Sequence, residues 1–285
     1  MTSENLDAVR RRIDALDEEI LTLINKRLEL AASIREIKQN SGIPIHDPGR
    51  EQEIMSRLSK LNSGPLPEEG LRLIFGEIIS AARAMQNRFK ISYLGPKMTF
   101  TQMATMRHFG SSVDMEPFSS LDDIFREVER GAFDYGVVPI ENSTEGVVSH
   151  TLDLFLVTPL VIRAEILLEI AYDLLSRSGR REDIRKIVSH PQALAQCRGY
   201  LNRTFSGVER AEAPSTAAAA QAAADNPGIA AIASKAAGVF YGLKVMEENI
   251  QDSRVNVTRF LVIGKEEAPR AERSKTSLIF SVRHA

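Results

Sequence analysis

The first forty residues carry apolar side chains at alternating intervals of three and four. The series consists of Leu6, Val9, Ile13, Leu16, Ile20, Leu23, Leu30, Ile34 and Ile37, and the position that it skips holds Arg27. This spacing predicts one long amphipathic helix with coiled-coil character. At 1.5 Å per residue the helix would be about 50 Å long. A helix of this kind must bury its apolar stripe against other helices. The fold of the remaining chain must therefore accommodate that burial.

Arg27 is the exception on this stripe. A guanidinium among apolar neighbours is costly to bury unless an anion meets it. Two hypotheses remain open at this point. Arg27 either fixes the helix register by pairing with a Glu of a facing helix, or it binds an anionic ligand together with Lys38, which follows on nearly the same face.

Bulk composition excludes several classes of function. The net charge of -2 lacks the positive excess expected of a protein that binds nucleic acid or an anionic membrane. No apolar run is long enough to span a membrane, and the first residues lack the core of a signal peptide, so we expect a cytoplasmic chain without membrane contact. Cys197 is the single cysteine and the five histidines lack ligand-like spacing, so we expect no disulfide, no metal and no cofactor.

The sequence changes character near residue 90. Before it, the pattern predicts helices over 5–40, 47–61 and 65–89, with Asp47 as the cap and Pro48 at the first position of the second helix. The two later helices are too short to cover the first, so we expect a homodimer or a higher homo-oligomer.

After residue 90, short apolar strands alternate with polar turns and helices, which predicts an α/β domain with a largely parallel sheet. The expected strands are 91–94, 135–139, 186–188, 207–213 and 229–233.

Hydroxyl and amide side chains follow several of these strands. At the carboxyl ends of strands in one sheet, helix N-termini converge on a crevice suited to a small anion. Each of these residues alone is also an ordinary helix cap. The candidates are Thr99, Thr101, Asn142, Ser143, Thr144, Ser189, His190, Ser215, Thr216 and Ser234.

Residues 6 to 90 resemble the all-α chorismate mutase module. The resemblance is carried by Ala8-Val9-Arg10, Leu16-Asp17-Glu18, Arg27-Leu28-Glu29-Leu30-Ala31, Lys38, Asp47, Arg50-Glu51 and Gln86. It implies an intertwined helical dimer that rearranges chorismate to prephenate. Arg10 of one subunit and Arg27 of the other would bind the two carboxylates, with Arg50 nearby. Asp47 and Glu51 would hold the hydroxyl region, and the catalytic Lys38 and Gln86 would donate to the ether oxygen.

The next segment, from 91 to 264, resembles prephenate dehydratase, an α/β fold with two lobes like those of periplasmic binding proteins. The resemblance is carried by Tyr93-Leu94-Gly95-Pro96 with Thr99-Phe100, by Pro139-Ile140-Glu141-Asn142-Ser143-Thr144-Glu145-Gly146, by Ser189-His190-Pro191-Gln192-Ala193, by Ser215-Thr216-Ala217 and by Asn256-Val257-Thr258-Arg259-Phe260. It implies loss of water and carbon dioxide from prephenate to give phenylpyruvate. Thr258 would be the catalytic proton donor. The implied substrate-binding residues are Thr99, Asn142, Ser143, Thr144, Ser189, Gln192, Ser215, Thr216, Arg259 and Phe260.

Two further expectations concern local sequence. Met98 stands where the family usually has Gly, which we expect to restrict that turn to negative φ. Residues 275–285 resemble the first strand of the phenylalanine-binding ACT domain, so 267–285 would be a linker and the start of a truncated ACT domain, without phenylalanine inhibition. We therefore expect a helical domain over 1–90 and a dehydratase domain over 91–266. The alternative is a non-catalytic, ligand-sensing dimer with a binding-protein-like cleft.

Overall fold

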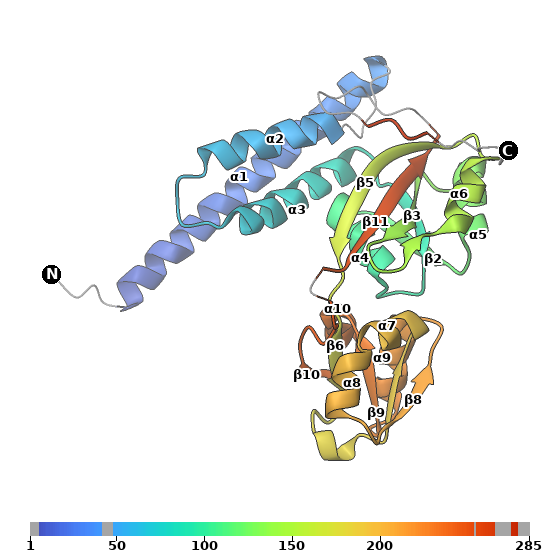
Figure 1. The fold of residues 1–285 in the computed structure, drawn as a ribbon. Coiled ribbons are helices and arrows are strands. Elements are labelled where there is room, and N and C mark those ends of the chain that lie inside the picture. Colours follow the sequence, from blue (N-terminus) through green and yellow to red (C-terminus); the bar gives the residue numbers. More distant parts are fainter. Residues whose placement is uncertain (1–5, 42–47, 254, 266–274, 279–285) are drawn as a thin grey trace. The chain divides into compact units, whose positions relative to one another are not determined.

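The chain forms two compact units (Figure 1). The computed structural model describes residues 6–41, 48–253, 255–265 and 275–278, without the side chains of 35–41 and Pro48. The first unit contains three long helices and the short segment Phe109–Asp114. The second unit contains Lys90–His108 and most of the chain after Met115. The segment Phe109–Asp114 therefore belongs to the helical unit, although the residues before and after it in the sequence belong to the second unit.

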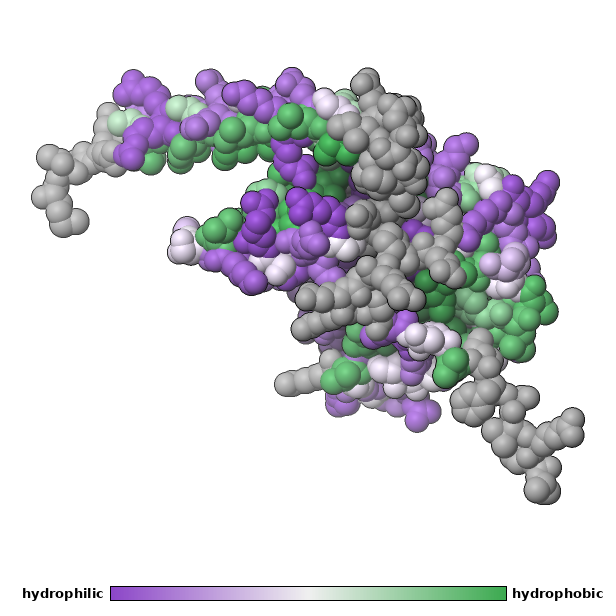
Figure 2. All heavy atoms as spheres, turned by 90° about the horizontal axis from the view of Figure 1, so that it is seen from above, coloured by the Kyte–Doolittle hydropathy of each residue, from purple (hydrophilic) through white to green (hydrophobic). Residues whose placement is uncertain are grey.

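Helix α1, Leu6–Ser41, is a single helix of 36 residues, as the apolar spacing predicts. Ala31 is buried, but most of the stripe is not: Ile13, Leu16 and Leu30 are each more than half exposed. Figure 2 shows these apolar residues as a green band along the helix. One chain alone leaves this apolar face in water.

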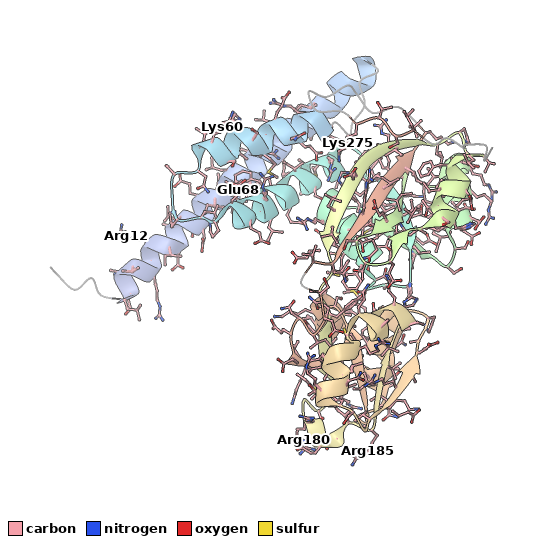
Figure 3. The ribbon with its side chains drawn as sticks, in the orientation of Figure 1. Arg12, Lys60, Glu68, Arg180, Arg185 and Lys275 are labelled. Atoms are coloured by element: carbon pink, nitrogen blue, oxygen red, sulfur yellow. The ribbon has the colours of Figure 1, made fainter. Side chains whose placement is uncertain are left out.

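Helices α2, Pro48–Leu61, and α3, Glu68–Gln86, form the rest of the helical unit. Pro48 begins α2 as predicted, whereas Asp47 lies outside the described residues. Ser59 Oγ donates to Glu68 Oε2 at 2.8 Å and links the two helices near their connection (Glu68 is labelled in Figure 3). Helix α3 ends three residues before the predicted end because Asn87 has an extended backbone and the chain turns into a strand.

The first lobe of the second unit is a mixed sheet of order β2-β1-β3-β11-β5, with β4 paired to β3. Its strands are β1 (Lys90–Leu94), β2 (Asp114–Phe118), β3 (Tyr135–Asn142), β4 (Gly146–Val147), β5 (Val161–Glu169) and β11 (Val257–Gly264). The accompanying helices are α4 (Phe100–Phe109), α5 (Leu121–Arg130) and α6 (Ser149–Phe155).

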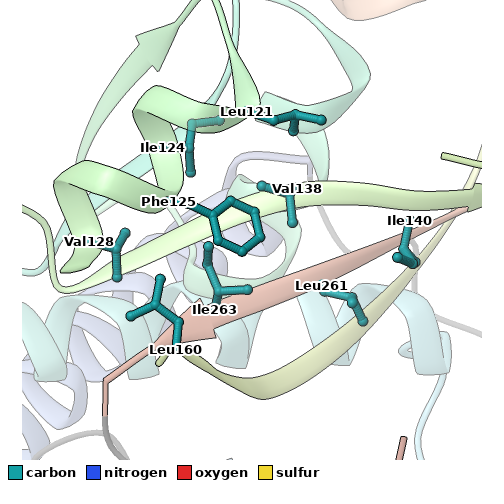
Figure 4. Close-up of a cluster of buried hydrophobic side chains, with 9 residues drawn as sticks. All are labelled: Leu121, Ile124, Phe125, Val128, Val138, Ile140, Leu160, Leu261 and Ile263. Carbon is teal, nitrogen blue, oxygen red and sulfur yellow. The ribbon is translucent and has the colours of Figure 1, made fainter. Parts of the chain in front are cut away.

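Helix α5 covers the sheet of this lobe with its apolar face (Figure 4). Ile124 and Val128 are fully buried against Val138 of β3 and Ile263 of β11. Ser120 caps the helix by accepting from Asp123 N at 3.1 Å. This packing holds β3 and β11 together, and both strands lead toward the cleft.

The second lobe is a sheet of order β10-β6-β9-β7-β8. Its strands are β6 (Asp173–Ser176), β7 (Lys186–Ser189), β8 (Glu209–Glu212), β9 (Ile229–Ala233) and β10 (Lys244–Glu247). Its helices are α7 (Pro191–Gln196), α8 (Arg198–Thr204), α9 (Thr216–Asp225) and α10 (Lys235–Phe240), with a 3-10 turn η1 (Arg181–Asp183). The alanines of α9 allow the helix to approach the sheet closely, and Ala219, Ala220 and Ala223 are fully buried there.

Two chain segments cross between the lobes. One joins β5 to β6 and the other joins β10 to β11 (Figure 1). They are bonded to each other: Ile170 N donates to Asn256 O at 2.7 Å, and Ile250 N donates to Tyr172 O at 2.8 Å. The two-lobed architecture expected from the resemblance is therefore present, with a double crossing as the hinge.

The prediction of a largely parallel sheet is wrong. β11 runs antiparallel to both β3 and β5, and β6 runs antiparallel to both β9 and β10. The reason is that the chain crosses between the lobes without an intervening helix, so the strand after each crossing enters its sheet in the opposite direction. The sequence pattern also missed β5 and β11, the two long strands that carry these crossings.

One further local prediction differs from the structure, and another stays a prediction. Met98 has φ of 65°, so the expectation of a negative φ at this turn is wrong. Its side chain packs against the core of the second lobe, and its N–H donates to Gln102 Oε1 at 2.5 Å, which holds the unfavourable backbone in place. Residues 275–278 have no strand, and the remainder of the predicted strand lies outside the described residues.

Candidate active sites

Arg27 faces helix α3. Its Nη1 donates to the carbonyl of Ile78 at 3.4 Å, and its side chain is partly buried. Burial lowers the pKa of the guanidinium. Within the described part of the chain no carboxylate forms an ion pair with Arg27, so the register hypothesis finds no partner Glu there. The charge remains available for a ligand.

Glu51 and Gln86 come from the other two helices. Glu51 of α2 forms an ion pair with Arg83 of α3, with 3.3 Å between Oε1 and Nη1. Gln86 is buried on α3, and its Oε1 has no hydrogen-bond partner among the described residues. Ala82 lies one turn before Gln86 and is buried with it. The structure thus gives α1, α2 and α3 one polar group each of the kind the mutase resemblance requires.

The remaining residues predicted for this site are Arg10, Arg50, Lys38 and Asp47. Arg10 is exposed and lies 3.7 Å from Asp7, one turn earlier on α1. Arg50 is exposed and pairs with Glu53 at 2.9 Å. Lys38 belongs to α1, but its side chain lies outside the described part of the structure, as does Asp47 entirely. Arg10 and Arg27 lie seventeen residues apart on α1, so within one chain they cannot meet at one small ligand.

A cavity of about 650 Å³ lies between the lobes of the second unit. Six of the candidate residues line it: Thr101, Asn142, His190, Gln192, Thr258 and Phe260. Thr144 lines a smaller adjoining cavity of about 280 Å³. Sequence reasoning missed several other wall residues, namely Phe100, Pro139, Glu141, Glu145, Ile170 and Tyr172.

Thr258 is held at this cavity by Asn142. The Asn142 Nδ2 donates to Thr258 Oγ1 at 2.8 Å, across the antiparallel pair of β3 and β11. The Asn142 Oδ1 in turn accepts from the backbone N–H of Thr144 at 2.9 Å and of Glu145 at 3.2 Å. Because two main-chain donors fix the carbonyl end of this amide, its NH₂ end must point at Thr258.

A chain of amides extends from Asn142 to the second lobe. Asn142 Nδ2 also donates to Asn256 Oδ1 at 3.0 Å, and Asn256 Nδ2 donates to Gln196 Oε1 at 2.7 Å. Asn256 is buried in the crossing segment, and Gln196 ends α7. The hinge and the second lobe therefore contribute to the orientation of Asn142.

Most of the other predicted hydroxyl residues satisfy local backbone groups. Ser189 Oγ is buried and donates to Ile232 O at 2.6 Å, and Ser215 caps α9 by accepting from Ala218 N. Thr99 Oγ1 lies 3.1 Å from the carbonyls of Leu94 and Pro96. None of these three lines the larger cavity, and neither do Ser143, Thr216 and Arg259.

Charges near the cavity are mainly negative. Glu141 and Glu145 are part of its wall, whereas no Lys or Arg is among its described lining residues. Arg259 is neutralised nearby, because its Nη2 lies 2.8 Å from Glu165 Oε2 and its Nη1 lies 3.6 Å from Glu141 Oε2. Phe260 is buried and supplies an apolar wall.

Other titratable groups near the cleft have structural explanations. His190 caps α7, with its Nδ1 3.4 Å from Gln192 N, as one of its two predicted roles requires. Burial, with smaller contributions from Cys197 and Glu145, raises the pKa of Tyr172. Burial also raises the pKa of Cys197 to about 12, with a further contribution from Asp252, so this cysteine behaves as a buried thiol rather than a nucleophile.

Among the described residues, no group of three or more His, Cys, Asp or Glu side chains is arranged to hold a metal ion. The same residues include no helix long and apolar enough to cross a membrane.

The two units define a class of enzyme in which an all-helical unit is followed by a two-lobed α/β unit with a cavity between its lobes. Residues 9–87 match the chorismate mutase type II family, and residues 91–268 match the prephenate dehydratase family. The chain belongs to the bifunctional chorismate mutase/prephenate dehydratase family. It carries the chorismate mutase and prephenate dehydratase activities of phenylalanine biosynthesis.

Similar proteins span nearly all of this chain. The bifunctional chorismate mutase/prephenate dehydratase of Aquifex aeolicus is 44% identical over 98% of the chain and 78% of its own length. The Escherichia coli protein of the same description is 34% identical over 99% of the chain and 78% of its own length. Their descriptions as enzymes argue against the alternative of a non-catalytic ligand sensor.

A solved structure supports the fold of the second unit. The prephenate dehydratase of Arthrobacter aurescens, solved in complex with L-Phe, superposes with a TM-score of 0.60 at 34% identity. The match covers 65% of this chain and 63% of that one. The helical unit followed by two mixed α/β sheets is thus the arrangement of the family.

Proposed function

We propose that residues 1–90 rearrange chorismate to prephenate and that residues 91–266 convert prephenate to phenylpyruvate. Residues 267–285 would be a linker and the start of an ACT-like domain. Each substrate is a small dianion, and each proposed site uses side chains of one unit. The cytoplasm stays the expected location for both reactions.

The proposed mutase site is a cage of fixed charges and donors. The rearrangement is pericyclic and needs no nucleophile, acid or base, so the enzyme must select the compact diaxial conformer and stabilise negative charge on the breaking ether oxygen. Arg27 and Arg10 of the partner subunit bind the two carboxylates, with Arg50 near them. Lys38 and Gln86 donate to the ether oxygen, while Asp47 and Glu51 hold the hydroxyl region.

This assignment requires a dimer. Arg10 and Arg27 are roughly 25 Å apart along one helix, so they cannot contact one small ligand within a single chain. The exposed apolar stripe of α1 gives the surface that a second copy would bury. Burial of this stripe in a homodimer would bring Arg10 of the partner subunit toward Arg27.

The hydrogen bond from Asn142 to Thr258 carries the dehydratase proposal. Because Thr258 Oγ1 accepts from an amide whose orientation is fixed, its own proton is left to donate into the cavity. We assign that proton to the ring hydroxyl of prephenate. The C–O bond breaks as the hydroxyl takes the Thr258 proton and leaves as water, the electrons of the C–CO₂ bond enter the ring, and carbon dioxide departs. Thr258 then regains a proton from solvent.

The negative walls of the cleft suit this chemistry. The departing carboxylate must not be stabilised more in the substrate than in the transition state. A position near Glu141, Glu145 and the apolar Phe260, away from cations, disfavours the carboxylate relative to neutral carbon dioxide. Gln192 and the remaining hydroxyl groups, including Thr144, Ser143 and Thr216, would donate to the side-chain carboxylate as the lobes close.

Feeding chorismate and following both prephenate and phenylpyruvate tests the assignment. Lys38→Ala should abolish formation of prephenate from chorismate but leave conversion of added prephenate intact. Thr258→Ala should let prephenate accumulate without phenylpyruvate. Loss of both reactions in either variant, with the fold retained, would argue for one shared site.

A further inference from the structure

Arg83 connects the candidate mutase site to a distant part of the chain. Its side chain is only 7% exposed. Its Nη1 lies 3.3 Å from Glu51 Oε1 on α2, and its Nη2 donates to the carbonyl of Phe109 at 2.6 Å. The guanidinium also lies 5.9 Å from the centre of the Phe109 ring. A buried guanidinium held on two sides has little freedom, so it restrains both of its neighbours.

The segment Phe109–Asp114 is fastened to α3 beside Arg83. Ser80 Oγ donates to Phe109 O at 2.8 Å and accepts from Ser112 N at 3.2 Å. One turn earlier, Glu77 Oε2 accepts from the hydroxyl of Ser111 at 2.6 Å. A side chain on Gly110 would not fit, since its Cβ would lie 2.4 Å from the Cβ of Ser80. The segment therefore has one defined position on the helix.

We propose that Arg83 is a positioning residue for the mutase reaction. It orients the carboxylate of Glu51, and the segment Phe109–Asp114 completes the mutase site by holding Arg83. The inference rests on the role proposed above for Glu51. It makes the first reaction dependent on residues that lie within the dehydratase sequence.

A double-mutant cycle in the full chain tests this inference. Arg83→Met and Glu51→Gln should each lower kcat/KM for chorismate by about tenfold or more. The double variant should be no worse than Glu51→Gln alone, because Arg83 acts through Glu51. The dehydratase kcat/KM, measured on the same preparations, should stay within about twofold of the native value.

Each contrary outcome has a separate meaning. An unchanged mutase rate in Glu51→Gln would overturn the role proposed for Glu51. A damaged Glu51→Gln beside a native-like Arg83→Met would overturn the positioning role alone. Additive losses, or an equal loss of dehydratase activity, would show that Arg83 only stabilises the fold and would likewise overturn it.

Ser80→Ala is the matched control. It removes a bond to the same Phe109 carbonyl but does not touch Glu51, so we expect mutase kcat/KM within about twofold of native. If Arg83→Met does not fold, Arg83→Gln takes its place in the cycle. Glutamine keeps a donor for the Phe109 carbonyl and removes the charge, so it separates the two contacts of Arg83.

Discussion

Asn142 sets the direction in which Thr258 can donate its proton. Asn142→Asp would replace the donating NH₂ by a carboxylate oxygen at nearly the same place, and this oxygen would accept the Thr258 proton instead. We expect dehydratase kcat to fall by roughly a hundredfold, as for the loss of a general acid, with mutase activity unchanged. Steady-state assays with prephenate and chorismate check both. Dehydratase activity near the native level would contradict the assigned direction.

Gln86 supplies a donor that needs no ionisable proton. We expect native mutase activity to be nearly flat from about pH 5 to about pH 8. In Gln86→Glu only the protonated carboxyl can donate, and burial at this position raises its pKa. The rate of this variant should therefore fall as the pH rises through that pKa. A pH profile for chorismate turnover checks the prediction, and a steep fall above neutrality in the native chain would contradict the role of Gln86.

The sequence indicated the roles of some residues but not of others. Arg27 is conspicuous because it interrupts an apolar stripe, and Thr258 because it belongs to a recognisable motif. Arg83 was missed, although it follows Ala82 on the buried face of α3 and offered the same signal as Arg27. Ser189 and Ser215 could not be separated from helix caps and backbone contacts by sequence, because a hydroxyl beside a helix start serves either purpose.

The segment Phe109–Asp114 packs closely on helix α3, and Gly110 is the point of closest approach. Gly110→Ala places a Cβ against Ser80 at a backbone φ of 73°. We expect a loss of about 1–3 kcal/mol in the free energy of unfolding. Gly207→Ala is the matched control, because nothing lies within 4 Å of its new Cβ. Thermal unfolding of both variants checks the prediction, and equal midpoints would contradict it.

Elements with a strong local signal were predicted well. The apolar spacing of α1 and the start of α2 at Pro48 depend only on nearby residues, and both are confirmed. The expected strands lacked β2, β5, β6, β10 and β11. The direction of β5 and β11 depends on the double crossing between the lobes, which leaves no local pattern in the sequence. Met98 was mispredicted for a similar reason, since packing against the second lobe supports its positive φ.

The whole molecule is expected to work as a dimer for its first reaction. Arg10→Ala and Arg27→Ala should each be nearly inactive as mutases. Mixed and allowed to exchange subunits, they should recover about a quarter of native activity, since half of the dimers are mixed and each has one intact site of two. Each variant refolded alone is the control. No recovery, with exchange demonstrated by a labelled subunit, would contradict a site shared between subunits.

The central place of β11 in the first lobe has a consequence for synthesis of the chain. β11 lies between β3 and β5, but it is translated only after the whole second lobe. The second lobe is continuous in sequence and can fold as it leaves the ribosome. Until β11 arrives, β3 and β5 face each other as open strand edges that invite wrong pairing. Slow translation of the second lobe would prolong that exposure, so we expect the yield of folded enzyme to depend on the order in which the strands emerge as well as on final stability.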